Sequence, residues 1–523
     1  MYSKVYSGIP VVIEGMLISV EADISNGLPA FDLVGYLAAS VKEARDRVRS
    51  ALRNSGFILP AQRITVNLSP ADVRKDGTGF DLSIAVAVLI AMQVIPDSEK
   101  FNNILFLGEL GLDGRILPVP GVLPIVHFAS SRGINTVVVP SGNVTEARFI
   151  QDIEVSPVGS LRNLIEMLYE MCSGGEMGDL VFGENRDDTN LEVENPERRK
   201  EDSEYADFAD IRGMETAKRG MLIAAAGFHN ILMTGAAGSG KSMMAKALPG
   251  ILPEMDYKEK LELTKIYSVA GLLKGSTSLI ERRPYRAPHY SVSEYALIGG
   301  GEKPRPGEIS LATGGVLFLD EFPHFKKTAI EALRQPMEDK RVTVSRVRAS
   351  YTFPARFMLV AARNNCPCGL YPDRTRCKCT YHEIVTYQNR ISHPIMDRID
   401  IRLAVTPLPY EEMFRKEKGT PSSVMRSMVE AARERQSHRF RKESWSFNSE
   451  IPQGSMEKYI NLSLACDRML KTEYDKTDIS ARGYFKLLRL VRTVADLNDR
   501  DNITEDDIKE AIYFRNEGRE DVV

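Results

Sequence analysis

The 523-residue sequence is poor in several features, and each shortage excludes a class of protein. It has six cysteines, four of them within fourteen residues, which is not the pattern of a secreted disulfide scaffold. Its formal net charge is only -3, so it is not a general polycation. Any contact with nucleic acid must therefore depend on a local concentration of basic residues.

Long hydrophobic runs are also missing. The longest apolar run, residues 84–95, is interrupted by Gln93 and is shorter than the roughly 20 residues that span a bilayer. The sequence does not open with a basic segment followed by an apolar one, as a secretory leader does. We therefore expect a cytoplasmic protein without membrane contact. Its length suggests about three domains, and apolar residues make up 43%, enough for substantial cores.

A glycine-rich segment, GAAGSGKS at Gly235–Ser242, has the features of a phosphate-binding loop. It follows an apolar run at 231–233 and precedes a helix-forming run at 243–248. Lys241 is expected to reach the β and γ phosphates of a nucleotide, and the Ser242 hydroxyl to bind Mg²⁺. The glycines that let the backbone N–H groups turn toward the phosphates are Gly235, Gly238 and Gly240.

A second motif, GGVLFLDE at Gly314–Glu321, is typical of a buried strand that ends in two carboxylates. Asp320 is expected to hold magnesium through water, and Glu321 to polarise the attacking water. Alone, the motif could equally be a core strand ending on two solvated acids. Its position behind the phosphate loop favours the nucleotide site. The two motifs together predict hydrolysis of Mg²⁺-bound ATP.

The composition divides the chain into four parts. Residues 173–204 carry about eleven acidic residues against four basic ones and predict a solvated linker. We expect a mixed α/β N-terminal domain at 1–172, an ATPase core at 205–408 and a helical domain at 409–523. The N-terminal strands are predicted at 11–20, 63–68, 104–107 and 136–139, and the helices at 41–55, 82–92 and 123–131. Helices are also predicted at 480–498 and 504–514, near the C-terminus.

Several longer motifs resemble the YifB/ComM family of magnesium-chelatase-like AAA+ ATPases. They are the phosphate loop, the segments Arg283–Glu321, Met337–Arg346 and Ala361–Gly369, and DRIDI at Asp397–Ile401. The resemblance extends to the N-terminal domain through Asp23–Gly35, Asn54–Asp72 and Gly108–Pro124. The fold it implies is α/β and multidomain. It has a Lon-protease-like (ribosomal S5 domain 2-like) N-terminal domain, a parallel-sheet AAA+ core and a C-terminal helical lid.

The resemblance implies a ring, usually a hexamer, with ATP held between neighbouring subunits. Asn364 resembles the sensor 1 residue that orients the attacking water. Arg398 resembles the finger inserted into the neighbour's site, and Arg482 the sensor 2 arginine that closes the lid on the γ phosphate. An arginine worth orders of magnitude in rate would then act only after the ring assembles.

Two basic segments go beyond what ATP hydrolysis requires. Residues 279–310 place basic residues around Tyr285 and Tyr290, and residues 340–348 alternate β-branched and basic residues as a hairpin does. In related AAA+ proteins such inserts face the central channel, where basic residues would follow a phosphate backbone without reading sequence. Packing between subunits is the alternative. The candidate DNA contacts are Arg283, Arg286, Arg341, Arg346 and Arg348.

The crowded cysteines are Cys366, Cys368, Cys377 and Cys379, two C-x-C pairs separated by eight residues. Four thiolates on one loop can satisfy tetrahedral Zn²⁺, although C-x-C is tighter than the usual spacing. A zinc site there would fix the loop after Asn364. The alternative is a set of reduced thiols without a function.

The resemblance to Lon invites a protease interpretation, which the residues oppose. Where the protease carries its nucleophilic serine, after KDG, this sequence has Thr78, Gly79 and Phe80. Where it carries its basic lysine, after LPVPG, stand Val122, Leu123 and Pro124. Without a nucleophile and its base, acyl transfer has no route. We expect a scaffold for ring assembly or partner docking.

Three functions remain open. The first is an ATP-driven motor on DNA, with helicase or branch-migration activity on recombination intermediates, as the ComM group implies. The second is a chelatase-type remodeller of a partner subunit, and the third is a chaperone-like ring that acts on proteins. The Lon-like domain joined to the ATPase favours the first.

Overall fold

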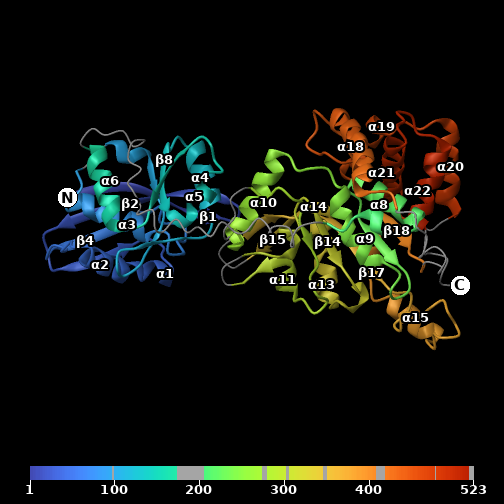
Figure 1. Cartoon of the computed structure of the whole chain (residues 1–523), viewed down its shortest axis with the longest axis horizontal. Coiled ribbons are helices and arrows are strands. Elements are labelled where there is room, and N and C mark those ends of the chain that lie inside the picture. Colours follow the sequence, from blue (N-terminus) through green and yellow to red (C-terminus); the bar gives the residue numbers. More distant parts are fainter. Residues whose placement is uncertain are drawn as a thin grey trace. The chain divides into compact units, whose positions relative to one another are not determined.

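The computed structural model describes residues 1–96, 99–172, 205–273, 279–301, 305–345, 350–407, 419–476 and 479–516. The chain forms two compact units (Figure 1). Unit 1 contains residues 1–195 and 257–281, and unit 2 contains 196–256 and 282–523. The predicted linker at 173–204 lies outside the described residues. Within the described ranges, no helix has both the length and the apolar character needed to cross a membrane.

Unit 1 is built on a seven-stranded mixed sheet in the order β3-β4-β2-β1-β5-β8-β9. The pairs β1–β2 and β2–β4 are antiparallel, and the other neighbours are parallel. The strands are β1 (Tyr2–Val11), β2 (Glu14–Ser25), β3 (Ala30–Val34), β4 (Arg63–Ser69), β5 (Ile104–Phe106), β8 (Thr136–Pro140) and β9 (Glu154–Val158). The main helices are α2 (Ala44–Asn54), α3 (Asp81–Ala91), α4 (Val122–Ser131) and α6 (Leu161–Cys172). The predicted mixed α/β class is confirmed.

One predicted strand of this unit is wrong. Residues 11–20 do not form a single strand, because β1 and β2 meet in a tight turn there and pair Val11 with Glu14. Val12 lies in that turn at φ 63°, a left-handed conformation that β-branched residues rarely adopt. The apolar residues on both sides of the turn continue the strand-like pattern. The pattern therefore conceals the reversal of the chain.

A helix from the middle of the sequence belongs to unit 1. Helix α10 (Tyr257–Ala270) contacts α4, and the Ser268 hydroxyl donates a hydrogen bond to the half-buried Glu146 carboxylate. Burial raises the pKa of Glu146, an effect opposed by hydrogen bonds from Ser268 and from the Leu123 N–H. The sequence-based division assigned these residues to the ATPase core. The helix instead joins the Lon-like sheet as an added element.

Unit 2 contains a five-stranded parallel sheet in the order β11-β14-β17-β10-β18. The strands are β10 (Ile231–Thr234), β11 (Tyr285–Arg286), β14 (Val316–Leu319), β17 (Met358–Arg363) and β18 (Ile401–Ala404). Strands β10, β14 and β17 are fully buried, as expected of a parallel sheet covered on both faces. This order brings the ends of β10, β14 and β17 together at one sheet edge, where ligands bind in open α/β sheets.

The helices after the sheet match their predicted positions closely. Helix α21 (Ala481–Leu497) is capped by the Ser480 hydroxyl, and α22 (Glu505–Asn516) follows Thr504. Thr504 and Asp507 exchange side-chain-to-backbone hydrogen bonds, which satisfy free N–H groups at the helix start. The other helices used below are α9 (Lys241–Ala247), α13 (Lys327–Ala332), α14 (Arg334–Asp339), α15 (Tyr381–Gln388), α18 (Ser422–Arg439) and α20 (Leu464–Lys476). The predicted parallel-sheet core with a C-terminal helical region is confirmed (Figure 1).

Candidate active site

The predicted phosphate loop joins β10 to α9, and each of its glycines has a structural reason. A Cβ on Gly235 would lie 2.1 Å from the Val405 carbonyl oxygen, so the close approach of β18 requires glycine. Gly238 and Gly240 have φ values of 78° and 91°, which glycine alone adopts without strain. The loop therefore turns its backbone toward the N-terminus of α9, the geometry that binds phosphate.

Lys241 lies over this loop. Its ammonium donates to the carbonyls of Gly235 (2.9 Å) and Ala236 (2.7 Å) and to the Asn364 side-chain oxygen (3.2 Å). Burial lowers the pKa of Lys241, an effect that Asp320 opposes. Asn364 directly follows β17, next to β10 in the sheet, which explains how residues 123 positions apart meet. The structure thus brings the predicted sensor residue to the predicted phosphate-binding lysine.

The predicted magnesium ligands also meet. The Ser242 hydroxyl donates to the Asp320 carboxylate at 2.8 Å, at the end of β14. Glu321 follows in a left-handed conformation (φ 51°), and its N–H donates to Asp320 at 2.9 Å. Hydroxyl and carboxylate oxygens are the ligands that Mg²⁺ takes beside nucleotide phosphates. Both acids are exposed, and Asp320 is the one that accepts a hydrogen bond from Ser242.

The two arginines predicted to act on the γ phosphate share one carboxylate in the single chain. Glu338 of α14 accepts from Arg398 at 2.7 Å and from Arg482 at 3.0 Å. Arg398 also donates to the carbonyls of Arg334 and Pro394, and its side chain is only 8% exposed. Glu338 is not among the site residues predicted from the sequence. It lies 60 positions from Arg398, and no local pattern signals the pairing.

A buried charge network lies behind Arg398. Asp400 accepts from Lys486 of α21 at 2.5 Å and from the Asn230 N–H at 2.9 Å. Lys486 and the nearby His229 hold the pKa of the Asp400 carboxyl well below its usual range, against the effect of burial. Lys486 also donates to the Arg398 carbonyl at 2.8 Å. The network therefore fixes the helix that carries Arg482 to the loop that carries Arg398.

Removing one member of this network should unfold unit 2 more easily. We expect Asp400→Asn to lower the free energy of unfolding by about 3 kcal/mol, because it leaves the Lys486 charge buried without its partner. Urea unfolding followed by the fluorescence of Trp445, the single tryptophan, would measure this effect in unit 2. Adding Lys486→Met should recover part of the loss. Asp397→Asn changes a half-buried residue of the same loop and is the control. If both variants unfolded at the same urea concentration, the network would not be important for stability.

The four clustered cysteines come together as predicted. Their sulfur atoms all lie within 4.8 Å of one another, on the loop between β17 and α15. Cys366 and Cys377 are buried, Cys379 is half-buried and Cys368 is exposed. The remaining cysteines, Cys172 and Cys466, are also free thiols and lie elsewhere in the chain.

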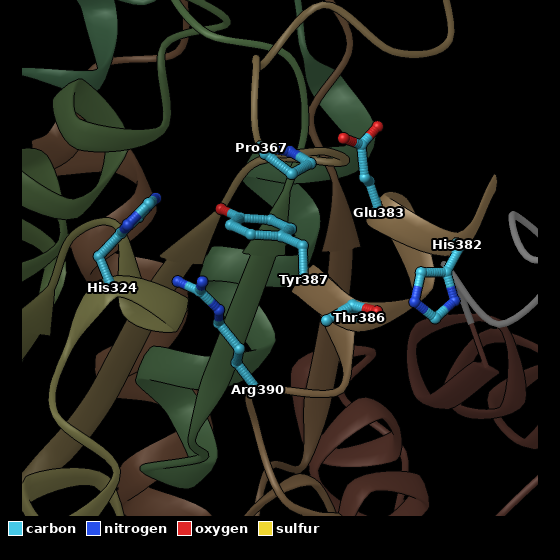
Figure 2. Close-up of a pocket in the computed structure, with 7 residues that line it drawn as sticks. All are labelled: His324, Pro367, His382, Glu383, Thr386, Tyr387 and Arg390. Atoms are coloured by element: carbon cyan, nitrogen blue, oxygen red, sulfur yellow. The ribbon is translucent and has the colours of Figure 1, made fainter. Parts of the chain in front are cut away.

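A cavity of about 260 Å³ adjoins this loop. Figure 2 shows the Tyr387 hydroxyl and the Arg390 guanidinium both directed toward the side where His324 lies. Pro367, between two of the cysteines, forms another wall. The Tyr387 hydroxyl is buried, and burial raises its pKa. His324, one of the residues that line the cavity, follows Glu321 by three positions in the sequence. Residue spacing gave no signal for it.

The basic segments divide into buried and exposed arginines. Arg283 is buried and donates to the carbonyls of Pro253, Glu254 and Gly314, and Arg286 forms a two-point ion pair with Glu308. These contacts stabilise the fold of this segment, and a role of both arginines in DNA binding stays a prediction. Their positions in a basic, aromatic stretch gave no indication of these internal partners.

The second basic segment forms the predicted hairpin. Strands β15 (Arg341–Ser345) and β16 (Ser350–Pro354) are antiparallel, and Arg341 is exposed while Val342 is buried. Arg346 and Arg348 lie outside the described residues.

In unit 1, the positions of a Lon-type catalytic pair are not equipped for acyl transfer. The Gly79 position has no side chain, and Leu123 is fully buried in an apolar cluster. The neighbouring Thr78 hydroxyl donates to Glu109 at 2.5 Å. A carboxylate there can accept a proton, but no lysine contacts Thr78 among the hydrogen bonds of the described residues. The sequence-based expectation of a scaffold domain stays a prediction.

Comparison with known proteins agrees with this geometry. Residues 207–413 match the family model described as magnesium chelatase, subunit ChlI. Residues 20–143 match the model described as subunit ChlI of Mg-chelatase. Residues 419–515 match the model of the C-terminal part of magnesium chelatase subunit ChlI. The chain is 38% identical to competence protein ComM of Haemophilus influenzae over 98% of this chain and 97% of that protein. It is 38% identical to the uncharacterized protein YifB of Escherichia coli over 95% and 94%.

A partial match concerns the Lon-like region. The chain is 28% identical to a Lon protease of Roseiflexus castenholzii over 142 residues, which cover 26% of this chain and 17% of the protease. The family models and the full-length relatives together identify the family of the whole chain. The phosphate loop, the acidic pair and the parallel sheet agree with that family. The chain therefore belongs to the magnesium-chelatase-like family of AAA+ ATPases that includes ComM and YifB, with ATP and Mg²⁺ as its implied ligands.

Proposed function

We propose that this ATPase is a ring motor on DNA, working in the cytoplasm with helicase or branch-migration activity on recombination intermediates. The similarity to a competence protein supports this direction. The observation that carries the proposal is the basic hairpin β15–β16 and its attachment to the arginine site.

The hairpin begins where α14 ends. Helix α14 contains Glu338, the shared partner of the two arginines, and Arg334, whose carbonyl accepts from Arg398. Arg341, the first residue of β15, follows Glu338 by three positions. A pull on the hairpin by a phosphate backbone would therefore move the partner of both arginines. This arrangement offers a direct mechanical route between DNA contact and ATP hydrolysis.

A ring, which we propose to be a homohexamer, would complete the nucleotide site. Arg398 and Arg482 meet at one carboxylate, so a neighbour's γ phosphate could replace Glu338 as the anion that both contact. Both arginines would then act on ATP held by the adjacent subunit. Exchange of a carboxylate for a phosphate keeps the guanidinium groups paired throughout. As further cofactor we propose Zn²⁺ at the four cysteines.

The hairpin's role in DNA binding can be tested by changing Arg341, Arg346 and Arg348 to alanine together. We expect weaker binding to all DNA sequences alike, and a salt dependence whose slope falls by about one for each lost phosphate contact. ATP binding should survive, because the hairpin is not part of the phosphate loop. Fluorescence anisotropy with single-stranded, duplex and four-way-branched DNA at several salt concentrations provides the measurement.

The matched control is the alanine replacement of three exposed cations elsewhere in unit 2: Arg441, Lys442 and Lys471. It removes the same charge and should leave the slope nearly unchanged. If both triple variants lost affinity equally, the effect would come from net charge and not from the hairpin. A wild-type ring that does not bind DNA at low salt would exclude the motor and favour a chelatase-like or chaperone-like remodeller.

A further inference from the structure

We propose that the four-cysteine loop is a structural Zn²⁺ site that braces the phosphate loop, so that loss of the metal weakens ATP binding. The ligands are Cys366, Cys368, Cys377 and Cys379. The effect on ATP rests on the proposed nucleotide site, whereas metal binding itself does not.

The sulfur positions fit a single tetrahedral ion. With Zn–S bonds of about 2.3 Å, the sulfur atoms of a tetrahedron lie about 3.8 Å apart. Cys366 is 3.3 Å from Cys368 and 3.7 Å from Cys377, and Cys368 is 3.5 Å from Cys377. The Tyr371 N–H points at the Cys366 sulfur at 3.4 Å, an outer contact that stabilises a thiolate ligand. A closed set of four sulfur ligands favours Zn²⁺ in a structural role.

The apolar core of the loop is small. Its apolar cluster consists of Cys366, Cys377 and Ile384, with Leu370 and Tyr371 packed against them. A cluster of this size buries too little apolar surface to order a segment by itself, and small folds of this kind use a metal instead. Thiol groups form only weak hydrogen bonds with one another, so they do not replace a metal as the organising contact.

The loop contacts the phosphate loop directly. The Gly369 carbonyl accepts from the Ala237 N–H at 3.0 Å, and the Gly369 N–H donates to the Cys366 carbonyl at 3.1 Å. Gly369 has a φ of 77°, and a Cβ there would lie 3.1 Å from that of Ala237. The turn at Gly369, next to Cys368, therefore packs directly against the phosphate loop. Its neighbour Ala236 holds the Lys241 ammonium through its carbonyl.

A second set of contacts reaches the sensor residue. Asn364 precedes Cys366 by two residues and contacts Lys241. Asn365, between Asn364 and Cys366, donates from its side-chain amide to the Tyr371 carbonyl at 3.1 Å. The Asn365 carbonyl accepts a hydrogen bond from the Gln388 side chain. Tyr371 is the residue whose N–H faces the Cys366 sulfur. Without the metal, Asn364 and the turn at Gly369 would therefore both be held less firmly beside the phosphate loop.

The experiment uses the full-length protein purified without added metal. We expect about one zinc per chain by elemental analysis, and its loss in the double variant Cys377→Ser, Cys379→Ser. Removing zinc from the wild type with a chelator should weaken the binding of a fluorescent ATP analogue roughly tenfold or more, and added Zn²⁺ should restore it. Cobalt in place of zinc should show the absorption bands of tetrahedral thiolate coordination. Cys172→Ser, Cys466→Ser is the control and should keep zinc and affinity.

Two results would overturn the proposal. Protein that contains no zinc and takes up neither Zn²⁺ nor Co²⁺ at the cysteines would exclude the metal site. Zinc-free protein that binds the analogue as tightly as zinc-loaded protein would exclude the brace. Lys241→Ala separates this failure from failure of the nucleotide site, because it should lose ATP binding while its zinc content stays at that of the wild type. Unchanged Trp445 fluorescence confirms that the stripped protein remains folded.

Discussion

Glu321→Gln should bind ATP as the wild type does but hydrolyse it more slowly, by on the order of 10²–10⁴-fold, the usual contribution of a positioned general base. The amide keeps the size of the carboxylate but cannot polarise the attacking water. Asp320, which faces Ser242, remains available for magnesium. The variant should therefore accumulate an ATP-bound state, measurable as retained nucleotide after rapid gel filtration.

Lys241→Ala should fail at the earlier step. It removes the cation expected at the β and γ phosphates, and a hydrogen bond to a charged group is worth about 1.5–3 kcal/mol. Binding should weaken by at least one order of magnitude, and the carbonyls of Gly235 and Ala236 lose their donor as well. Glu331→Gln, at a half-buried acid paired with Arg334, is the control and should behave as the wild type. Hydrolysis by Glu321→Gln at the wild-type rate would show that the acidic pair is wrongly assigned.

Arg398→Ala should still bind ATP but lose hydrolysis by roughly 10³–10⁵-fold, the range found for arginine fingers. If the site is shared between subunits, mixing Arg398→Ala with Lys241→Ala protein should restore part of the activity. Each variant supplies the group that the other lacks. Activity of the mixture, measured against each variant alone, tests the arrangement.

The contacts of Arg398 demand a second variant. Its side chain is nearly buried and is held by Glu338 and two carbonyl groups, so alanine could disturb the loop as well as the chemistry. Arg398→Lys keeps a charge for Glu338 but loses the planar fork that spans a phosphate. It should fold like the wild type and remain inactive alone. Mixed rings of proven composition that recover no activity would contradict a finger acting in trans.

The sequence predicted the parts of the site that depend on local motifs. The phosphate loop is one continuous segment that contains the three glycines, Lys241 and Ser242. The acidic pair Asp320 and Glu321 directly follows a buried strand. The parallel sheet then brings these segments together at one edge, as expected. Helix α3 also matches the helix predicted at 82–92, and all eleven of its residues are buried in the structure.

The rest depends on partners far apart in the sequence. Glu338 meets Arg398 and Arg482, and Asp400 meets Lys486 across 86 positions; no periodicity encodes such pairs. The same limitation explains Arg283, whose basic neighbourhood suggested DNA although backbone carbonyls hold its guanidinium. A buried cation and an exposed one look alike in sequence, because burial is decided by the packing around them.

The most direct test of the proposed function is the rate of ATP hydrolysis with and without DNA, at low salt, using single-stranded, duplex and four-way-branched substrates. A motor on DNA predicts faster hydrolysis with at least one substrate, and loss of that stimulation when Arg341, Arg346 and Arg348 are replaced by alanine. The basal rate without DNA should stay unchanged in this variant. A wild-type rate that is the same with all three substrates as without DNA would contradict the motor.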